Sequence, residues 1–287
     1  MKPTARLREL LAQPDMITAP GAYDGITARL IEQAGFPAVY MTGAGTSMAR
    51  GFPDFGLLSM NEMAENAAVI ARTVEIPVIA DADTGYGNEL NVTRTVREFE
   101  ARGVAGIHIE DQASPKRCGH LDGKEIIPQA EFISKIRAAV AARRDSDFLI
   151  IARTDSRAVA GFDEAVARAN AALAAGAGMA FVEAVQTAEE LALVPQRVKG
   201  PCLLNIVPGG KTPRITLQEA QALGYRLAIM PGLLLSAVMV AADQALRTVK
   251  ESGVSPSTPK GATVMDTFRR FGADEWNALR QRFATED

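Results

Sequence analysis

Carboxylates follow two neighbouring apolar runs near the middle of the chain. Asp81 and Asp83 come after the run 77–80, and Glu110 comes after the run 106–109. A segment with helical spacing separates the runs, so the unit has the pattern of two parallel strands joined by a helix, with acids at neighbouring strand ends. Carboxylates gathered in this way repel one another unless a cation lies between them, and Mg²⁺ or Mn²⁺ prefers oxygen ligands. The sequence therefore predicts a divalent metal site at Asp81, Asp83 and Glu110.

A cysteine between charged residues follows the second of these runs. Residues 116–120 read Lys116-Arg117-Cys118-Gly119-His120. Positive charge close to a thiol lowers its pKa and favours the reactive thiolate. We therefore expect Cys118 to be chemically active, with Lys116 as a second catalytic residue beside it. A metal site and an activated thiol so close together in the chain indicate an enzyme.

Strand-like runs alternate with helix-like segments along most of the chain. The strand-like runs are 16–19, 38–42, 77–80, 106–109, 148–152, 179–182, 202–206 and 227–230. The helix-like segments are 23–33, 61–73, 91–102, 130–144, 163–175, 187–198, 216–223 and 233–252. Eight β-then-α units are typical of a (β/α)8 TIM-type barrel. The alternative, an open doubly wound sheet, usually carries a glycine-rich fingerprint after its first strand, and this sequence has none there.

The last part of the chain has a different pattern. We expect residues 1–253 to form the catalytic barrel, with a short helix at 1–13, and residues 254–287 to form a turn-rich linker and a helical tail. Apolar side chains recur in the tail at nearly helical spacing: Phe268, Phe271, Trp276, Leu279 and Phe283. This stripe needs a partner surface, either on its own barrel or on a neighbouring subunit.

The composition limits the possible partners. The 287 residues carry a formal net charge of −3, which argues against nucleic acid or an anionic membrane surface as the main partner. No signal peptide is visible, and no apolar run approaches the roughly 20 residues that span a bilayer. The two cysteines, Cys118 and Cys202, are expected as free thiols. We therefore expect a cytoplasmic protein that binds a small molecule.

Polar residues stand at the ends of nearly all predicted strands, where barrel enzymes place their active sites. In chain order they are Tyr40, Thr42, Asp81, Asp83, His108, Glu110, Asp111, Arg153, Asp155, Glu183 and Asn205. Buried charge is costly unless it is paired or bound to metal, so a purely structural barrel would have no need of this set.

Several of these residues have two interpretations. Arg153 suits a substrate carboxylate through bidentate hydrogen bonds, or it neutralises the surrounding acids. His108 lies within an apolar strand and is explained equally well as a hydrogen-bonded core histidine. The Thr-Gly-Ala-Gly segment 42–45 either forms a tight turn or brings backbone N–H groups to an oxyanion.

These motifs resemble those of the isocitrate lyase and phosphoenolpyruvate mutase superfamily over about residues 8–250. The matching stretches are 40–45, 53–54, ADADTGYGN at 80–88, HIEDQ at 108–112, KRCGH at 116–120, IARTD at 151–155, Glu183 and Asn205. The cysteine motif after a strand that ends in IEDQ points to the lyase branch, because mutase-type members lack it.

The resemblance implies a barrel with a swapped C-terminal helix, assembled as a homotetramer. It implies Mg²⁺, with Mn²⁺ as a possible substitute, held near Asp83, while Asp81 and Glu110 reach the ion largely through water. Cys118 would be the catalytic acid or base, and Tyr40 or a carboxylate would take the substrate's hydroxyl proton. The residues expected to bind the small carboxylate substrate are Thr42, Gly43, Ala44, Gly119, His120, Arg153, Glu183 and Asn205.

The expected activity is that of a carbon–carbon (oxo-acid) lyase, which cleaves a 2-hydroxy di- or tricarboxylate into a 2-keto acid and a carboxylic acid. The alternatives are a carboxyphosphoenolpyruvate phosphonomutase, an oxaloacetate hydrolase or decarboxylase, and a non-catalytic binding barrel. Relatives that act on methylisocitrate carry an arginine about one turn into the helix after strand 8. Here that helix begins at Leu233 and has no arginine before Arg247. The leucines at the start of the helix suit methyl groups instead, and Lys211 is the one residue that could supply the missing cation. We therefore expect a smaller, alkyl-bearing acid such as 2,3-dimethylmalate to be the better substrate.

Overall fold

The computed structural model describes residues 1–256 and 261–284 of the chain. The chain divides into two compact units, Met1–Leu235 and Ser236–Asp287. None of the described helices combines the length and the apolar character needed to cross a lipid bilayer.

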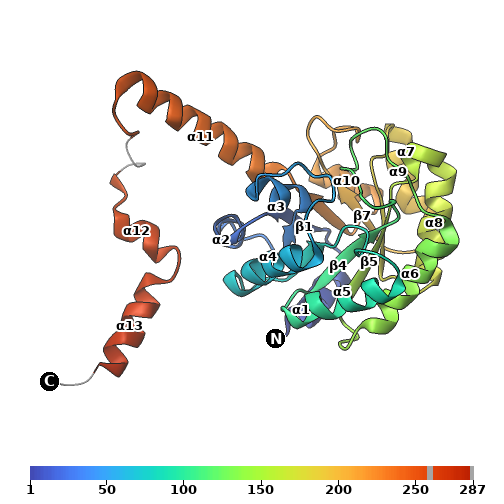
Figure 1. Cartoon of the computed structure of the whole chain (residues 1–287), viewed down its shortest axis with the longest axis horizontal. Coiled ribbons are helices and arrows are strands. Elements are labelled where there is room, and N and C mark those ends of the chain that lie inside the picture. Colours follow the sequence, from blue (N-terminus) through green and yellow to red (C-terminus); the bar gives the residue numbers. More distant parts are fainter. Residues whose placement is uncertain (257–260, 285–287) are drawn as a thin grey trace. The chain divides into compact units, whose positions relative to one another are not determined.

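The first unit is a closed barrel of eight parallel strands that pair in chain order (Figure 1). The strands are β1 (Ile17–Ala22), β2 (Val39–Met41), β3 (Val78–Asp81), β4 (Gly106–Glu110), β5 (Leu149–Thr154), β6 (Met179–Val182), β7 (Cys202–Asn205) and β8 (Leu227–Met230). The barrel closes between β1 and β8, where Ile17 is in register with Leu227 and Pro20 with Met230. The eight predicted strands are confirmed to within two residues at most ends, and the alternative of an open sheet is wrong.

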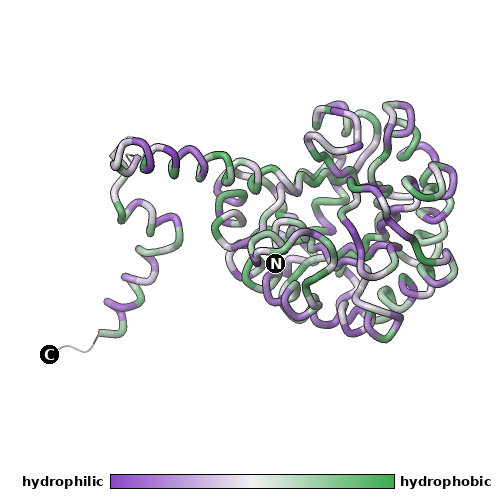
Figure 2. The backbone as a smooth tube through the Cα atoms, turned by 45° about the horizontal axis from the view of Figure 1, so that its top comes forward, coloured by the Kyte–Doolittle hydropathy of each residue, from purple (hydrophilic) through white to green (hydrophobic). Residues whose placement is uncertain are grey.

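Helices follow the strands and surround the barrel (Figure 1). They are α1 (Pro3–Ala12), α2 (Gly25–Gln33), α3 (Gly43–Ala49), α4 (Met60–Thr73), α5 (Glu89–Ala101), α6 (Gln129–Ala142), α7 (Arg157–Ala160), α8 (Phe162–Ala174), α9 (Ala188–Arg197) and α10 (Leu217–Leu223). The helix α11 (Leu233–Ser252) comes after β8 and belongs mostly to the second unit. Their traces alternate between hydrophobic and hydrophilic colours, as expected for helices with one buried face (Figure 2). The predicted helices are confirmed, whereas the short α3 and α7 are additional.

Side-chain caps fix where several of these helices begin. Asp24, Ser59 and Thr216 each accept a hydrogen bond from the backbone N–H of the third helical residue, whose side chain in turn accepts one from the cap. Thr42 caps α3 by accepting a hydrogen bond from the Gly45 N–H. The segment 42–45, expected to be a turn or an oxyanion site, is therefore the start of a short helix.

The N-terminal end of the barrel is filled with apolar side chains. Leu7 of α1 is fully buried and packs in one cluster with Ile17, Leu149 and Leu227, each the first residue of its strand. Burying such a side chain contributes about 1.5–3 kcal/mol. Because this end is closed by the core, the opposite end of the strands is where polar side chains can meet a ligand.

The second unit contains most of α11 together with α12 (Val264–Arg269) and α13 (Ala273–Phe283). Phe268, Trp276 and Phe283 are 58%, 71% and 72% exposed. The predicted linker falls partly on residues 257–260, which lie outside the described residues. The predicted domain boundary at residue 253 and the partner of the tail stay predictions.

Candidate active site

A pocket of about 120 Å³ lies at the carboxyl ends of the barrel strands. One wall comes from the segment 113–124 after β4, which we call the cysteine loop. The lining residues are Tyr40, Thr42, Ala44, Asp54, Asp81, Cys118, Gly119, His120, Arg153, Glu183, Asn205, Val207, Pro231 and Gly232. Most residues predicted from the sequence therefore meet here.

Four predicted residues stand directly behind this lining. The backbone N–H of Asp83 donates to Asp81, Glu110 pairs with Arg153, and Lys116 pairs with Asp54; a Cβ added at Gly43 would collide with the Asp81 carboxylate. The structure thus places these four next to the pocket without exposing them in it.

Arg153, near the end of β5, holds three carboxylates together. Its guanidinium lies 2.9 Å from Asp155 Oδ2, 3.2 Å from Glu110 Oε2 and 3.5 Å from Glu183 Oε2, and its side chain is only 7% exposed. Burial alone would raise the pKa of Glu183, but the charge of Arg153 and hydrogen bonds from two neighbouring side chains outweigh burial and lower it. Arg153 is therefore a counter-ion of these acids, and its place in the pocket lining also allows it to meet a substrate carboxylate.

Two buried acids have oxygens without hydrogen-bond partners. These are both oxygens of Glu110 and Oδ1 of Asp83, although Arg153 and Lys116 lie at ion-pair distance. Burial raises the pKa of Asp83 to about 6 and that of Glu110 well above its usual value, because the nearby cations compensate only in part. The two acids are thus short of positive charge, a condition that a bound cation relieves.

The described residues nevertheless contain no group of three or more His, Cys, Asp or Glu side chains that could hold a metal by themselves. Asp81, Asp83 and Glu110 therefore do not converge as three direct ligands; Asp83 pairs with Lys116 and Glu110 pairs with Arg153 instead. The metal site stays a prediction.

The cations that flank Cys118 in the sequence do not pair with its thiol. Lys116 Nζ lies 2.5 Å from Asp54 Oδ1 and 2.8 Å from Asp83 Oδ1, and the Arg117 guanidinium lies over an aromatic ring. Burial raises the pKa of Cys118, opposed in part by a backbone hydrogen bond. The prediction that its sequence neighbours lower this pKa is therefore wrong. A thiol that stays protonated at neutral pH suits a proton donor.

Tyr40 and His108 form a buried pair at the bottom of the pocket. The Tyr40 hydroxyl lies 2.8 Å from His108 Nε2, and Asp81 Oδ1 lies 3.5 Å from the same nitrogen. Burial lowers the pKa of His108 to about 4 against the opposite effect of Asp81, so the ring is neutral at pH 7. His108 is thus a hydrogen-bonded interior histidine that lies behind Tyr40.

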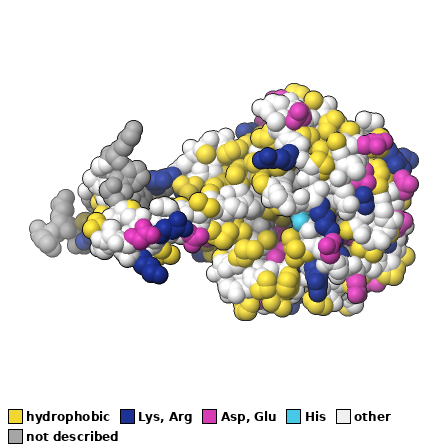
Figure 3. All heavy atoms as spheres, turned by 90° about the horizontal axis from the view of Figure 1, so that it is seen from above, with side chains coloured by type: hydrophobic (Ala, Val, Ile, Leu, Met, Phe, Trp, Pro, Cys, Tyr) yellow, Lys and Arg dark blue, Asp and Glu magenta, His cyan; other side chains and the backbone are white. Residues whose placement is uncertain are grey.

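The cysteine loop is joined to the loop after β7. His120 Nδ1 accepts a 3.0 Å hydrogen bond from the Lys211 N–H, and its Nε2 lies 3.3 Å from Glu183 Oε1 and 3.4 Å from Asn205 Nδ2. Lys211 Nζ also pairs with Asp122 near the tip of the cysteine loop. A histidine is visible at the surface beside basic and acidic side chains (Figure 3). These contacts close the pocket on the side of His120.

Unusual backbone conformations occur where the acids leave the strands. Asp83, Tyr86 and Ala184 have φ values of 46°, 63° and 54°, in the region that favours glycine. Such conformations cost about 1–3 kcal/mol each and persist where the surroundings impose them. At Ala184, the backbone N–H donates a 2.7 Å hydrogen bond to Glu183 Oε1. At Ala184 the strained backbone thus directs its N–H at a carboxylate of the pocket lining.

Five residues of the site were not assigned a role from the sequence: Asp54, Lys124, Val207, Pro231 and Gly232. Asp54 belongs to one of the matched motifs, and this match was the signal that could have identified it. It pairs with a lysine 62 residues away, a contact that no local pattern reveals. Lys124 and Val207 lie in loops whose folded course has no sequence signature.

A closed (β/α)8 barrel with buried acids, an arginine and a thiol around a small pocket at its strand ends defines a TIM-barrel enzyme. The family model for phosphoenolpyruvate phosphomutase matches residues 7–250. A 2,3-dimethylmalate lyase from Eubacterium barkeri is 45% identical over 280 residues, covering 97% of this chain and 94% of that protein. A 2-methylisocitrate lyase from Aeropyrum pernix is 45% identical over 252 residues, covering 88% and 81%.

Solved structures of similar sequence have the same fold. Oxaloacetate acetylhydrolase in complex with the inhibitor 3,3-difluorooxalacetate matches with a TM-score of 0.94 and 38% identity, covering 98% of this chain and 97% of that chain. Phosphonopyruvate hydrolase in complex with oxalate and Mg²⁺ matches with a TM-score of 0.89 and 32% identity, covering 99% of each. The chain belongs to the phosphoenolpyruvate mutase/isocitrate lyase superfamily, as its motifs predicted.

Proposed function

We propose that this enzyme cleaves a carbon–carbon bond in a 2-hydroxy di- or tricarboxylate and releases a 2-keto acid and a carboxylic acid. The observation that carries the proposal is the presence of a protonated thiol, Cys118, and a guanidinium, Arg153, in the lining of one small pocket. The guanidinium suits a substrate carboxylate, and the thiol can deliver a proton to a departing carbon. The two lyases that resemble the chain support this reaction class.

We assign the two ends of the substrate to opposite sides of the pocket. Thr42, Gly43, Ala44 and Arg153 belong to the side that binds the hydroxy-acid end. The other end is assigned to Gly119, His120, Glu183 and Asn205. On that side, Asn205 Nδ2 donates a 3.0 Å hydrogen bond to Glu183 Oε2, while Asn205 Oδ1 is buried without a partner and is free to accept one.

The reaction removes one proton and delivers another. When the hydroxyl proton leaves, the C–O bond becomes a carbonyl, the adjacent C–C bond breaks, and its electron pair remains on the carbon beside the second carboxylate. Cys118 donates its S–H proton to that carbon. Tyr40 or a carboxylate accepts the hydroxyl proton. Burial raises the pKa of Tyr40 far above its usual value and lowers that of the neighbouring His108 to about 4, so His108 is a poor acceptor for the Tyr40 proton. A carboxylate is therefore the better acceptor of the two.

We assign a divalent cation, Mg²⁺ or alternatively Mn²⁺, to the acids around Asp83. The two Glu110 oxygens without hydrogen bonds and the raised pKa values of both Asp83 and Glu110 fit such an ion. Mg²⁺ commonly binds through one or two carboxylates and several waters, so Asp83 would hold it directly and Asp81 and Glu110 through water. When bound, the cation stabilises negative charge on the substrate's hydroxyl and carboxylate oxygens. Lys116 holds Asp83 in place from the other side.

We further propose a cytoplasmic homotetramer in which the tail packs on a neighbouring subunit. The exposed side chains of Phe268, Trp276 and Phe283 support a partner surface in the tail, because large apolar groups gathered in this way favour association. Both cysteines are free thiols, which fits a reducing compartment.

Hydrolysis of oxaloacetate is the second candidate, favoured by the likeness to oxaloacetate acetylhydrolase; phosphonate mutase chemistry is the third. The test is release of 2-keto acid from 2,3-dimethylmalate and 2-methylisocitrate, of oxalate from oxaloacetate, and formation of phosphoenolpyruvate from phosphonopyruvate, each with Mg²⁺. We expect cleavage of a hydroxy acid, lost in Cys118→Ser. Turnover of oxaloacetate or the phosphonate alone would overturn the lyase proposal.

A further inference from the structure

We propose that Lys124 is a positioning residue that ties the cysteine loop to the arginine of the pocket. Lys124 lies at the return end of the loop, and its side chain is 1% exposed. Its Nζ donates one hydrogen bond to the carbonyl of Gly119, next to Cys118, and another of 3.1 Å to Asp155 Oδ1. The reaction described above does not use this buried cation.

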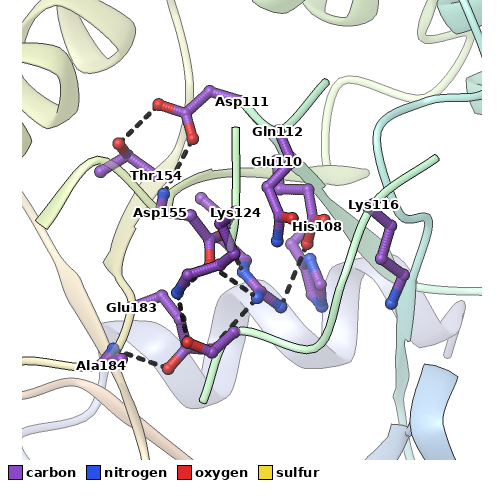
Figure 4. Close-up of polar contacts among 12 residues, drawn as sticks. His108, Glu110, Asp111, Gln112, Lys116, Lys124, Thr154, Asp155, Glu183 and Ala184 are labelled. Atoms are coloured by element: carbon purple, nitrogen blue, oxygen red, sulfur yellow. Dashed lines mark hydrogen bonds and ion pairs between the residues drawn. The ribbon is translucent and has the colours of Figure 1, made fainter. Parts of the chain in front are cut away.

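The second contact reaches the group that orients Arg153. Asp155 accepts from Arg153 Nε at 2.9 Å and from Arg153 Nη2 at 3.2 Å, and the latter bond ends on the same oxygen that Lys124 contacts. Asp155 is itself fixed, because its backbone N–H donates to Asp111 Oδ1 at 2.8 Å. Figure 4 shows Lys124 and Asp155 together between Asp111 and Glu183. Lys124 therefore connects the backbone beside Cys118 with the carboxylate that orients Arg153.

The first contact fixes the loop where it passes closest to the pocket. A Cβ added at Gly119 would collide with the Arg153 guanidinium and the Glu183 side chain, so the backbone at Gly119 runs directly against both. This close approach and the 2.9 Å hydrogen bond from the Leu121 N–H to the Cys118 carbonyl hold the backbone there, and the Gly119 carbonyl accepts from Lys124. Losing the ammonium would leave the carbonyl and Asp155 without a shared donor.

Lys116, the other buried lysine of the cysteine loop, has a different role. Lys116 pairs with Asp54 and Asp83, and in Figure 4 it lies on the far side of His108 from Lys124. The exposed tip of the loop is tied by Lys211 to Asp122 instead. Lys124 is thus the buried attachment of the loop, and it acts on Cys118 and Arg153 through their neighbours.

The test compares Lys124→Met with wild type and with the control Lys199→Met, which removes an exposed lysine outside the pocket. The first measurement is the rate of alkylation of Cys118 by iodoacetamide, followed by mass spectrometry. Cys202 is 1% exposed and serves as an internal reference for unfolding. Loss of a charged hydrogen bond predicts that Lys124→Met is alkylated at Cys118 about tenfold to a hundredfold faster, with Cys202 unlabelled.

The second measurement is steady-state turnover of 2,3-dimethylmalate, which rests on the proposed function. We expect kcat to fall at least about tenfold in Lys124→Met, with a smaller rise in KM, and no change in Lys199→Met. If the wild type cleaves no acid, the proposed lyase function is refuted, whereas the alkylation rate still tests whether Lys124 positions the cysteine loop.

Alkylation of Cys118 at the wild-type rate in a folded Lys124→Met protein would overturn the proposal. A second variant, Lys124→Gln, keeps a neutral donor for the Gly119 carbonyl and should give intermediate alkylation. If Cys202 is labelled as fast as Cys118 in both variants, Lys124 maintains the fold as a whole and the positioning role is rejected.

Discussion

Replacing Arg153 by methionine removes the one guanidinium that faces three buried acids. Asp155 Oδ2 lies 2.9 Å away, and at an effective dielectric constant of about 20 unit charges at that distance interact by about 6 kcal/mol. The side chain is 7% exposed, so solvent screens it little. Removing one partner of a buried ion pair typically costs about 3–5 kcal/mol, and we expect this loss in the free energy of unfolding at pH 7.5.

The loss in the free energy of unfolding caused by Arg153→Met should be smaller at lower pH. In the wild type, Arg153 helps to lower the pKa of Glu183, so the stability contributed by the Glu183 carboxylate is present above its unfolded pKa and is lost only at strongly acidic pH. Without the guanidinium, burial should raise the folded pKa of both Glu110 and Glu183. A raised acid destabilises the fold while ionised, and this penalty disappears as the pH falls through the raised pKa. The difference between variant and wild type should therefore be smaller at pH 5 than at pH 7.5.

Urea denaturation at fixed protein concentration measures the loss in the free energy of unfolding at pH 7.5 and at pH 5. Arg157→Met is the matched control, because Arg157 also donates to both oxygens of one carboxylate, at 2.8 and 2.9 Å on Glu190, but its side chain is 19% exposed. We expect Arg157→Met to lower the free energy of unfolding by only about 0–1 kcal/mol. An Arg153→Met protein as stable as the control, or equally weakened at both pH values, would show that the three ion pairs do not carry the energy assigned to them.

Three further predictions concern catalysis and assembly. Cys118→Ser should lower kcat by several orders of magnitude with a modest change in KM, since a hydroxyl is a far weaker acid than a thiol. The control Cys202→Ser should have nearly wild-type kinetics. A near-normal kcat in Cys118→Ser would exclude Cys118 from the mechanism. Exhaustive chelation or Asp83→Ala should abolish turnover. Because the pKa of Asp83 is raised to about 6, the affinity for Mg²⁺ measured by calorimetry should fall about tenfold per pH unit below pH 6. An affinity that does not change with pH would contradict this prediction. Truncation before Thr263 should split the oligomer or expose apolar surface, and light scattering would show an unchanged mass if the tail has no such role.

The barrel could be predicted because its strands are short apolar runs that end in polar residues. Asp81 ends β3 and Asn205 ends β7, and these positions in the sequence alone place both at the same rim. The helix α3 was missed because the small residues of 42–45 have weak helical preference, and only the folded Thr42 cap reveals its start.

The state of the thiol could not be predicted, since it depends on burial and on contacts between distant segments. Lys116 precedes Cys118 by two residues, yet its ammonium pairs with Asp54, 62 residues away. A charge that is satisfied elsewhere cannot lower the pKa of a neighbouring thiol, so burial decides the direction. Sequence spacing therefore identified the reactive residue but not its protonation.

The choice between substrates depends on how many carboxylates the pocket can neutralise. Of the described residues that line it, Arg153 is the only arginine or lysine, and it already faces three acids. Lys211, which was the one candidate for an additional cation, pairs with Asp122 instead. The third carboxylate of methylisocitrate would thus be buried without a partner, which costs several kcal/mol.

Methyl groups meet a more favourable surface in the same pocket. Val207, Pro231 and Ala44 supply apolar lining, where each buried CH₂ contributes about 0.8 kcal/mol. The leucines that begin α11, expected from the sequence to fill this role, are not among the lining residues: Leu233 is 44% exposed and Leu234 packs on the core. We expect kcat/KM for 2,3-dimethylmalate to exceed that for 2-methylisocitrate by at least about tenfold. Val207→Arg should narrow this gap by supplying the missing cation, and a wild-type preference for methylisocitrate would show that the pocket neutralises a third carboxylate after all.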